Sequence, residues 1–176
     1  IEIPLELGWC LFQNHRSEEA ISLLQNYKPN KDTEYNYYNL YGRLLYQIKH
    51  YEDALPLLEK WYSIICSLKD DGTEKTQKRL SRFGMASYFL SECYSELNRL
   101  KEAEDILHLA ISKSDRTIES LEHENHLADI YLKHQHYEQA IDLCDTIISK
   151  DTTYYPAYVI RQECFYHLDK GQEVVD

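Results

Sequence analysis

The chain has 176 residues, of which 43% are hydrophobic, and this share suits a folded domain with a sizeable core and excludes a disordered chain. Its formal net charge of −11 opposes nucleic acid as a partner because acidic surfaces repel phosphate backbones, and five Gly with four Pro are too few for a loop-rich β-sandwich. Five cysteines without a C-x-x-C motif favour free thiols in the cytoplasm, and the absence of an apolar run of about 18 residues argues against a membrane span.

Apolar residues recur at helical spacing along the chain, which predicts an all-α fold. In chain order, we expect helices at residues 4–14, 17–27, 34–48, 51–70, 73–97, 100–113, 117–134, 137–149 and 155–168, with a further start at 171. No linker between them is long enough to separate two domains, so residues 1–176 are expected to form a single domain.

An alanine recurs early in four of these helices, at Ala20, Ala54, Ala103 and Ala140. The first two are 34 residues apart, the last two are 37 apart, and Val174 follows Ala140 after another 34. A small residue stands twelve positions before each alanine and a Leu or Tyr stands nine before it: Gly8, Gly42, Ser91 and Ala128, then Leu11, Leu45, Tyr94 and Tyr131. This regularity predicts one structural unit repeated along the chain.

A 34-residue period with this spacing of small and large residues resembles the tetratricopeptide repeat (TPR). The resemblance implies a right-handed solenoid of tandem antiparallel helix hairpins, with units at about 1–33, 34–72, 73–116, 117–153 and a truncated 154–176. The sequence departs from the family in lacking its Pro after the second helix, and in placing Tyr27 and Trp61 at the second small position.

The interval from Ala54 to Ala103 is 49 residues, which is 15 more than the repeat and corresponds to about four helical turns. We therefore expect one elongated, protruding hairpin between units two and three, with a turn at Gly72 and a helix N-cap at Thr73. It carries the basic residues of the chain's one basic stretch, Lys69, Lys75, Lys78, Arg79 and Arg82. Because acids are interleaved with them, our interpretation is a solvated face, and contact with a partner is the alternative.

In the resembled family, side chains on the first helix of each unit contact bound peptides. Carried over to matching positions, the resemblance implies partner-binding residues at Trp9, Phe12, Asn36, Asn39, Arg43, Tyr46, Met85, Tyr88, Glu92, Asn125 and Asp129. For Trp9 and Phe12, packing on a preceding helix is an equal alternative. Some family members bind C-terminal carboxylates with a Lys/Asn/Arg clamp, but Arg43 is the one cation near the matching positions, so the sequence predicts no clamp.

No catalytic motif, metal site or cofactor site is predicted from the sequence. His123, His126 and Asp129 share a helix face and would suit a transition metal. However, His50 and His136 recur at equivalent turns, which indicates that such histidines are structural. Cys10, Cys93 and Cys164 follow equivalent positions and are expected to be equally buried.

The sequence therefore predicts a non-catalytic scaffold or adaptor that binds a peptide or protein in a concave groove. The alternative is a packing or oligomerisation module, with possible self-association. Two stretches, LEKWYSII…DDGTEKTQKR and YYPAYVIRQECFYHLDKGQEVVD, resemble the repeat region of some bacterial J-domain proteins and would imply a chaperone-associated parent protein. RNA binding by a related helical repeat and an enzymatic role are disfavoured, by the net charge and by the lack of a catalytic constellation.

Overall fold

The structure is a computed structural model that describes residues 3–114 and 117–173, with side chains at 3–114 and 118–169. All regular structure in these ranges is helical, which confirms the predicted all-α class. The chain divides into two compact units, residues 1–99 and 100–176. The expectation of a single domain stays a prediction.

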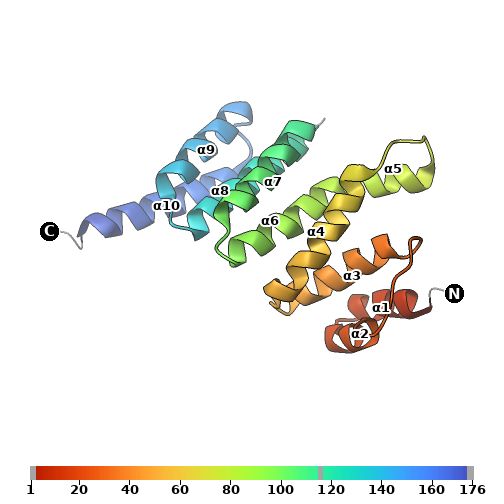
Figure 1. Ribbon diagram of the computed structural model, residues 1–176. Coiled ribbons are helices and arrows are strands. Elements are labelled where there is room, and N and C mark those ends of the chain that lie inside the picture. The colour runs from red at the N-terminus through yellow and green to blue at the C-terminus, as the bar shows by residue number, and fades with distance from the viewer. Residues whose placement is uncertain (1–2, 115–116, 174–176) are drawn as a thin grey trace. The chain divides into compact units, whose positions relative to one another are not determined.

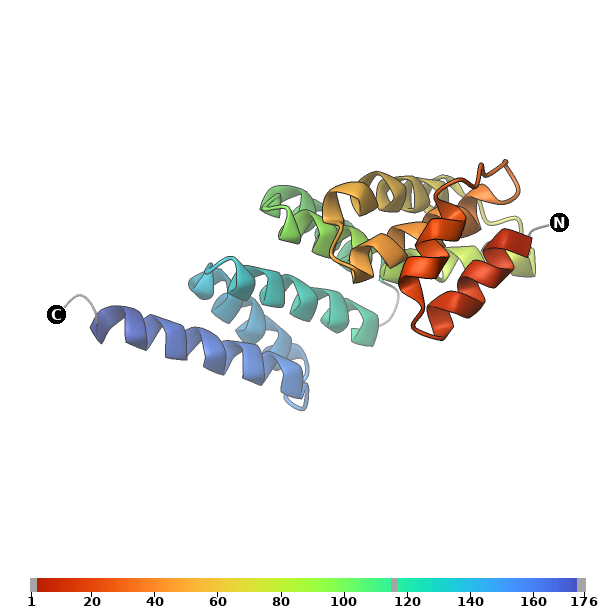
Figure 2. The same cartoon turned by 90° about the horizontal axis from the view of Figure 1, so that it is seen from below.

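The first unit contains six helices among its described residues, α1 to α6 (Figure 1). They are α1 (Ile3–Gln13), α2 (Ser17–Leu24), α3 (Glu34–Gln47), α4 (Tyr51–Ser67), α5 (Glu74–Leu80) and α6 (Phe83–Glu96). Helix α1 pairs with α2, and α3 pairs with α4, as antiparallel hairpins (Figures 1 and 2). Helix α3 also packs on α1 and α2, and α6 packs on α4 and α3.

The second unit contains four helices in the part that the structure describes. They are α7 (Leu100–Lys113), α8 (Thr117–Lys133), α9 (Tyr137–Lys150) and α10 (Tyr155–Glu173). Helix α8 packs against α7 and α9, and α10 packs against both α9 and α8. Between α8 and α9, Lys150 Nζ lies 2.7 Å from both carboxylate oxygens of Glu124, so this almost fully buried carboxylate has a cationic partner.

The repeated alanines lie where the sequence pattern predicts, inside the helix interfaces. Ala20, Ala54, Ala103 and Ala140 are all fully buried. The small residues that precede them allow close approach: a Cβ added at Gly42 would lie 2.9 Å from Leu58 Cδ2. Such a distance is too short for two carbon atoms, so any side chain at this position would force Leu58 to move and loosen the α3–α4 interface.

The turns between paired helices share one backbone geometry. His15, Lys49, Asn98 and Gln135 adopt positive φ angles of 57–63°, and each stands five residues before a repeated alanine. The next residue donates its N–H to the carbonyl of the Leu or Tyr that stands nine residues before that alanine, at Leu11, Leu45, Tyr94 and Tyr131. This bond pattern is that of the Schellman motif, which ends a helix and reverses the chain. His50 and His136 donate two of these bonds, which confirms their prediction as turn residues.

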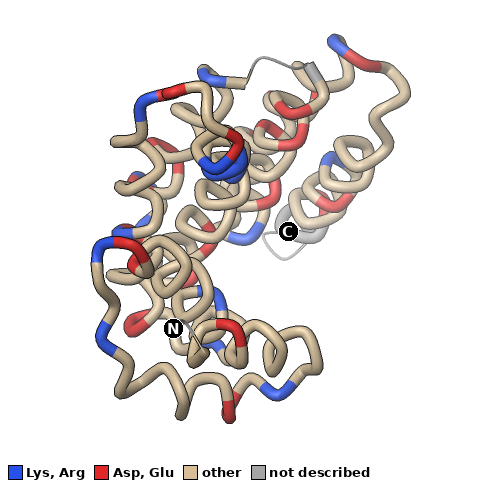
Figure 3. Tube along the Cα trace, turned by 90° about the vertical axis from the view of Figure 1, so that its right-hand side faces the viewer, with Lys and Arg blue, Asp and Glu red and all other residues tan. Residues whose placement is uncertain are grey.

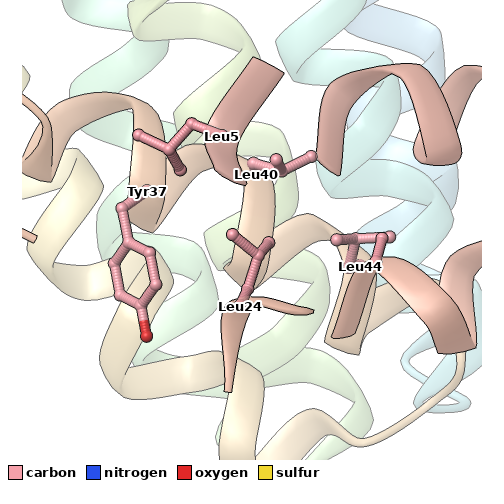
Figure 4. Close-up of a cluster of buried hydrophobic side chains, with 6 residues drawn as sticks. Leu5, Leu24, Tyr37, Leu40 and Leu44 are labelled. Atoms are coloured by element: carbon pink, nitrogen blue, oxygen red, sulfur yellow. The ribbon is translucent and has the colours of Figure 1, made fainter. Parts of the chain in front are cut away.

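The core of the first two hairpins forms around leucines from three helices. Leu5 comes from α1, Leu24 from α2, and Leu40 and Leu44 from α3, with Tyr37 at one side (Figure 4). All four leucines are at most 2% exposed. Neither hairpin could bury these side chains alone, so packing between neighbouring repeats stabilises both.

Helices α2 and α4 each end three residues before their predicted bounds of 27 and 70, and two further predicted helices differ more from those in the structure. The helix expected over 73–97 is interrupted at residues 81–82, where the Ser81 hydroxyl donates to the Lys78 carbonyl and competes with the helical backbone bonds. A single elongated hairpin is therefore not confirmed, although Thr73 caps α5 and Gly72 has a positive φ of 74°, as predicted. Helix α10 continues to Glu173, so the predicted new helix start at 171 is wrong, and Val174 lies outside the described residues.

The expectation of equal cysteine burial is also wrong. Cys93 and Cys164 are fully buried, but Cys10 is exposed. Cys93 lies against the neighbouring α4 hairpin, with its sulfur 3.2 Å from the Tyr51 carbonyl oxygen, whereas no described helix precedes α1 to cover Cys10. None of the described helices is both long and apolar enough to cross a bilayer.

Candidate functional site

Seven of the predicted partner-binding residues line two neighbouring pockets in the first unit. The first pocket takes Trp9, Asn36, Asn39, Arg43 and Met85, and the second takes Phe12 and Tyr46 together with Arg43 again. The two pockets therefore meet at the Arg43 side chain on α3.

The first pocket, called the basic pocket here, has a volume of about 380 Å³. Its walls come from α1, α3, α5 and α6 and from the break between the last two. Besides the five predicted residues, it is lined by Tyr35, Lys75, Lys78, Arg79 and Arg82. Five of its ten lining side chains are thus cationic, and none is acidic.

The second pocket, called the apolar pocket here, has a volume of about 360 Å³. Its lining is Phe12, Gln13, His15, Arg43, Tyr46, Gln47 and Phe89. Three aromatic rings face it, and two of them are in contact, since the ring centroids of Tyr46 and Phe89 lie 5.3 Å apart with an edge-on geometry. Such a lining accommodates an apolar or aromatic side chain.

Arg43 is held in place by aromatic rings. Its guanidinium carbon lies 4.9 Å from the ring centroid of Phe89, 5.1 Å from that of Phe12 and 5.7 Å from that of Trp9. These cation–π contacts fix the planar group between the two pockets. Burial, and then the nearby positive charge of Arg82, lower the pKa of Arg43. Its Nε is buried without a hydrogen-bond partner among the described residues.

Asn39 presents a second polar atom in the same pocket. The residue is 8% exposed, and its Oδ1 accepts no hydrogen bond within the described ranges. A buried amide oxygen without a partner is costly, and a peptide N–H is a natural donor for it. Asn39 and Arg43 both line the basic pocket, and each carries one buried polar atom without a hydrogen-bond partner among the described residues.

The α5 wall is anchored to α3 by an aromatic contact. The Arg79 guanidinium carbon lies 4.5 Å from the Tyr35 ring centroid, and Tyr35 in turn lies edge-on to the buried Trp61. This stack brings the basic residues of α5 beside the α3 face that carries Asn36 and Asn39. The turn at residues 81–82 separates α5 from α6, and Arg82 in this turn also lines the basic pocket.

The other four predicted residues do not line these pockets. Glu92 is 4% exposed and accepts the Tyr46 hydroxyl bond, and Tyr88 is 42% exposed beside Phe89. Asn125 and Asp129 belong to α8 in the second unit, where Asp129 pairs with Lys133 at 3.0 Å and Asn125 Oδ1 is buried without a partner among the described residues.

Sequence reasoning missed the α5 contribution to the site. The sequence predicts a solvated face for Lys75, Lys78, Arg79 and Arg82, with partner contact as the alternative; Lys75, Lys78 and Arg82 are exposed, and all four line the basic pocket. The available signal was the clustering of cations in a chain where Asp and Glu outnumber Lys and Arg by 30 to 19 (Figure 3). Tyr35 and Phe89 carried no comparable signal, because aromatic residues also fill helix interfaces.

Comparison with known proteins identifies a family that matches most of the sequence. Residues 32–165 match the protein family described as tetratricopeptide repeat protein 21 ARM repeat. A comparison with curated protein sequences gives no match.

Solved TPR structures resemble this chain at low sequence identity. YrrB, described as a TPR protein with an unusual peptide-binding site, is 13% identical with a TM-score of 0.62, covering 94% of this chain and 76% of its own. A putative kinesin light chain from Podosopora anserina, with nearly identical TPR-like repeats, is 16% identical with a TM-score of 0.60, covering 97% and 92%. The MamA RS-1 ArsTM double mutant is 13% identical with a TM-score of 0.59, covering 98% and 96%. These likenesses establish the TPR-like helical-repeat fold.

Proposed function

We infer the function of this chain from its family, because the chain belongs to the tetratricopeptide repeat protein 21 ARM repeat family. Repeats of this kind stack into extended surfaces that suit the binding of other proteins. We propose that the chain is a non-catalytic scaffold or adaptor that binds a peptide or protein segment. The proposed binding site is the groove formed by the basic pocket and the apolar pocket of the first unit.

One observation carries this proposal: two pockets of different chemistry meet at Arg43. Together they are too large for a single side chain, and they present buried polar atoms on Asn39 and Arg43 that accept or donate no bond within the described part of the chain. A peptide supplies backbone N–H and C=O groups for such atoms and side chains for both pockets. The peptide-binding site named for YrrB supports the proposal by analogy of fold.

Selection of peptides tests the proposal. A displayed library of random 12-residue peptides is selected on the full chain, and the affinity of the enriched peptides is measured by calorimetry for the double variant Asn36→Ala/Met85→Ala. Both side chains line the basic pocket and are only partly buried, so their truncation leaves the core intact. We expect at least about a tenfold loss of affinity, the factor typical of removing two contacts at a binding site.

The matched control is Ser63→Ala on the exposed face of α4, which lies in neither pocket. Its affinity for the same peptides should equal that of the unaltered chain. Enriched peptides that bind both variants equally well would place the binding surface elsewhere and contradict the proposal.

A packing or oligomerisation module is the second candidate, and an apolar surface on α10 favours it. Tyr155, Val159 and Tyr166 share one side of this helix by their spacing and are 73%, 44% and 56% exposed. Exposed apolar patches of this kind mark contact with other protein surfaces. Light scattering at micromolar concentration tests it: self-association that Val159→Glu/Tyr166→Glu abolishes would support this candidate, and a monomer would reject it. The J-domain resemblance and the cytoplasmic location stay predictions.

A further inference from the structure

The basic pocket concentrates positive charge from five side chains. Arg43, Lys75, Lys78, Arg79 and Arg82 line it, in a chain whose net charge is −11. None of these five cations forms an ion pair with a carboxylate in the described parts of the chain. Uncompensated cations that converge on one cavity favour an anionic group within it.

The geometry of Arg43 makes this preference specific for a planar, hydrogen-bonding anion. Its guanidinium group is clamped by the rings of Trp9, Phe12 and Phe89, so little conformational freedom remains to be lost when it binds. A guanidinium held in this way binds a carboxylate through two parallel N–H···O bonds. Because none of the residues that line the pocket is acidic, this carboxylate has to come from the ligand.

We propose that the basic pocket takes an Asp or Glu side chain of the bound peptide, and that an apolar side chain of the same peptide enters the neighbouring apolar pocket. The preferred partner is thus an acidic segment that contains a bulky apolar residue close to the acidic one. This inference rests on the proposed function, because it names the class of segment that the same groove binds. The Asn39 amide oxygen accepts a backbone N–H of that segment.

This arrangement differs from the Lys/Asn/Arg carboxylate clamp of some TPR proteins. Four of its five cations, Lys75, Lys78, Arg79 and Arg82, come from α5 and the residues just after it, outside the family's peptide-contacting positions. The ligand group is an internal acidic side chain in this proposal, and a free C-terminus is not required.

A peptide fits the site better than other anionic partners. A membrane surface or a nucleic acid presents many charges over a wide area, and a protein with a net charge of −11 is repelled by both outside the pocket. The cations line one cavity of about 380 Å³ beside aromatic side chains, which matches a single acidic side chain with an apolar neighbour.

The first test is the composition of the selected peptides. In the library selection on the full chain, we expect enrichment of peptides with Asp or Glu within a few residues of an aromatic or aliphatic residue. A synthetic version of the best peptide with each acid replaced by its amide should bind at least about tenfold more weakly, as expected for the loss of a charged hydrogen-bonded pair. The affinity of the acidic peptide should fall as sodium chloride is raised from 0.05 to 0.5 M, and that of the amide version should not.

The second test changes the exposed basic residues. Lys75→Gln/Lys78→Gln removes two charges at exposed positions of α5 that line the pocket. This variant should bind the acidic peptide about tenfold more weakly. The matched control, Lys28→Gln/Lys31→Gln, removes two exposed charges from the loop before α3 and should leave the affinity unchanged. Arg43→Lys keeps the charge but loses the planar pair of donors, so this variant should also bind the acidic peptide more weakly.

The outcomes separate this inference from the proposed function. Enriched neutral peptides that depend on Asn36 and Met85 but not on Lys75 and Lys78 would overturn the acidic preference and leave the groove assignment intact. Enriched peptides that ignore both sets of variants would overturn both proposals. Binding of phosphatidylserine vesicles that Lys75→Gln/Lys78→Gln abolishes, with no acidic peptide enriched, would assign the pocket to lipid and overturn the inference.

Discussion

The hydroxyl group of Tyr46 on α3 donates a hydrogen bond to Oε2 of Glu92 on α6, with the two oxygens 3.1 Å apart. Both residues were predicted from the sequence to contact a partner. In the structure, Tyr46 lines the apolar pocket, while Glu92 is 4% exposed and lies behind it. The bond therefore joins the wall of the proposed site to the core that supports it.

We predict that Tyr46→Phe lowers the free energy of unfolding by about 1–3 kcal/mol, the usual contribution of a hydrogen bond to a buried charged group. The aromatic ring and its contact with Phe89 are retained in this variant, so the effect isolates the hydroxyl group. Urea denaturation followed by circular dichroism measures it. Tyr155→Phe, at a tyrosine that is 73% exposed, serves as the control and should be neutral.

Gly42→Val is predicted to destabilise the α3–α4 hairpin by about 1–3 kcal/mol, the typical cost of overpacking a core. The new Cβ alone would lie 2.9 Å from Leu58 Cδ2 and 3.3 Å from Leu57 Cβ. Because Val is the better helix former of the two residues, any loss of stability comes from the clash. Chemical denaturation should show the loss for Gly42→Val but not for Ser63→Val on the exposed side of α4; equal stability of the two variants would contradict the close approach.

Stability should decrease above about pH 10, the ordinary pKa of tyrosine. Burial, and then the neighbouring Tyr41 and Tyr38, raise the pKa of Tyr37 to about 12, and burial with Glu104 raises the pKa of Tyr131 to about 12. The folded chain keeps these protons while the unfolded chain releases them above about pH 10, so their stabilisation is complete below that pH and is lost as the pH rises toward 12.

Urea unfolding at pH 8, 10 and 11.5 checks this dependence, with tyrosinate absorbance recorded in parallel. Tyr37→Phe should lose less stability between pH 10 and 11.5 than the unaltered chain, because one titrating group is removed. An unfolding free energy that stays constant over this range would show that folding does not raise the pKa values of these two tyrosines.

Thiol labelling of the native chain should be biphasic. Cys10 and Cys66 are exposed, whereas Cys93, Cys144 and Cys164 are fully buried. Burial is also the main cause that raises the pKa of Cys93 and of Cys144 to about 12, so thiolate is scarce at both. We expect Ellman's reagent to modify two thiols quickly and the other three at the rate of unfolding. The variant Cys10→Ser/Cys66→Ser should lose the fast phase; if it keeps one, a buried cysteine is accessible.

The helix pairing could be predicted from the sequence because it follows from local chemistry repeated in phase. The spacing from Gly42 to Ala54 requires two helices that approach closely, and the turn at Lys49 closes the same Schellman geometry as its equivalents. Cys10 is exposed, unlike Cys93 and Cys164, because burial in a repeat depends on the helices of a neighbouring repeat. The position of a residue within its own repeat does not show whether such helices cover it.

The residues of the candidate site could likewise be predicted from the sequence only in part. The resemblance to the TPR family implied Asn39, Arg43 and Tyr46 as binding residues, and their spacing of three or four residues puts them on one side of a first helix. That Lys78 of α5 lines the same cavity as Asn39 goes with a tertiary contact between α5 and α3, the stacking of Arg79 over Tyr35. These contacts join residues about forty positions apart, and helical periodicity carries no information at that distance, so tertiary packing alone decided the charge of the pocket.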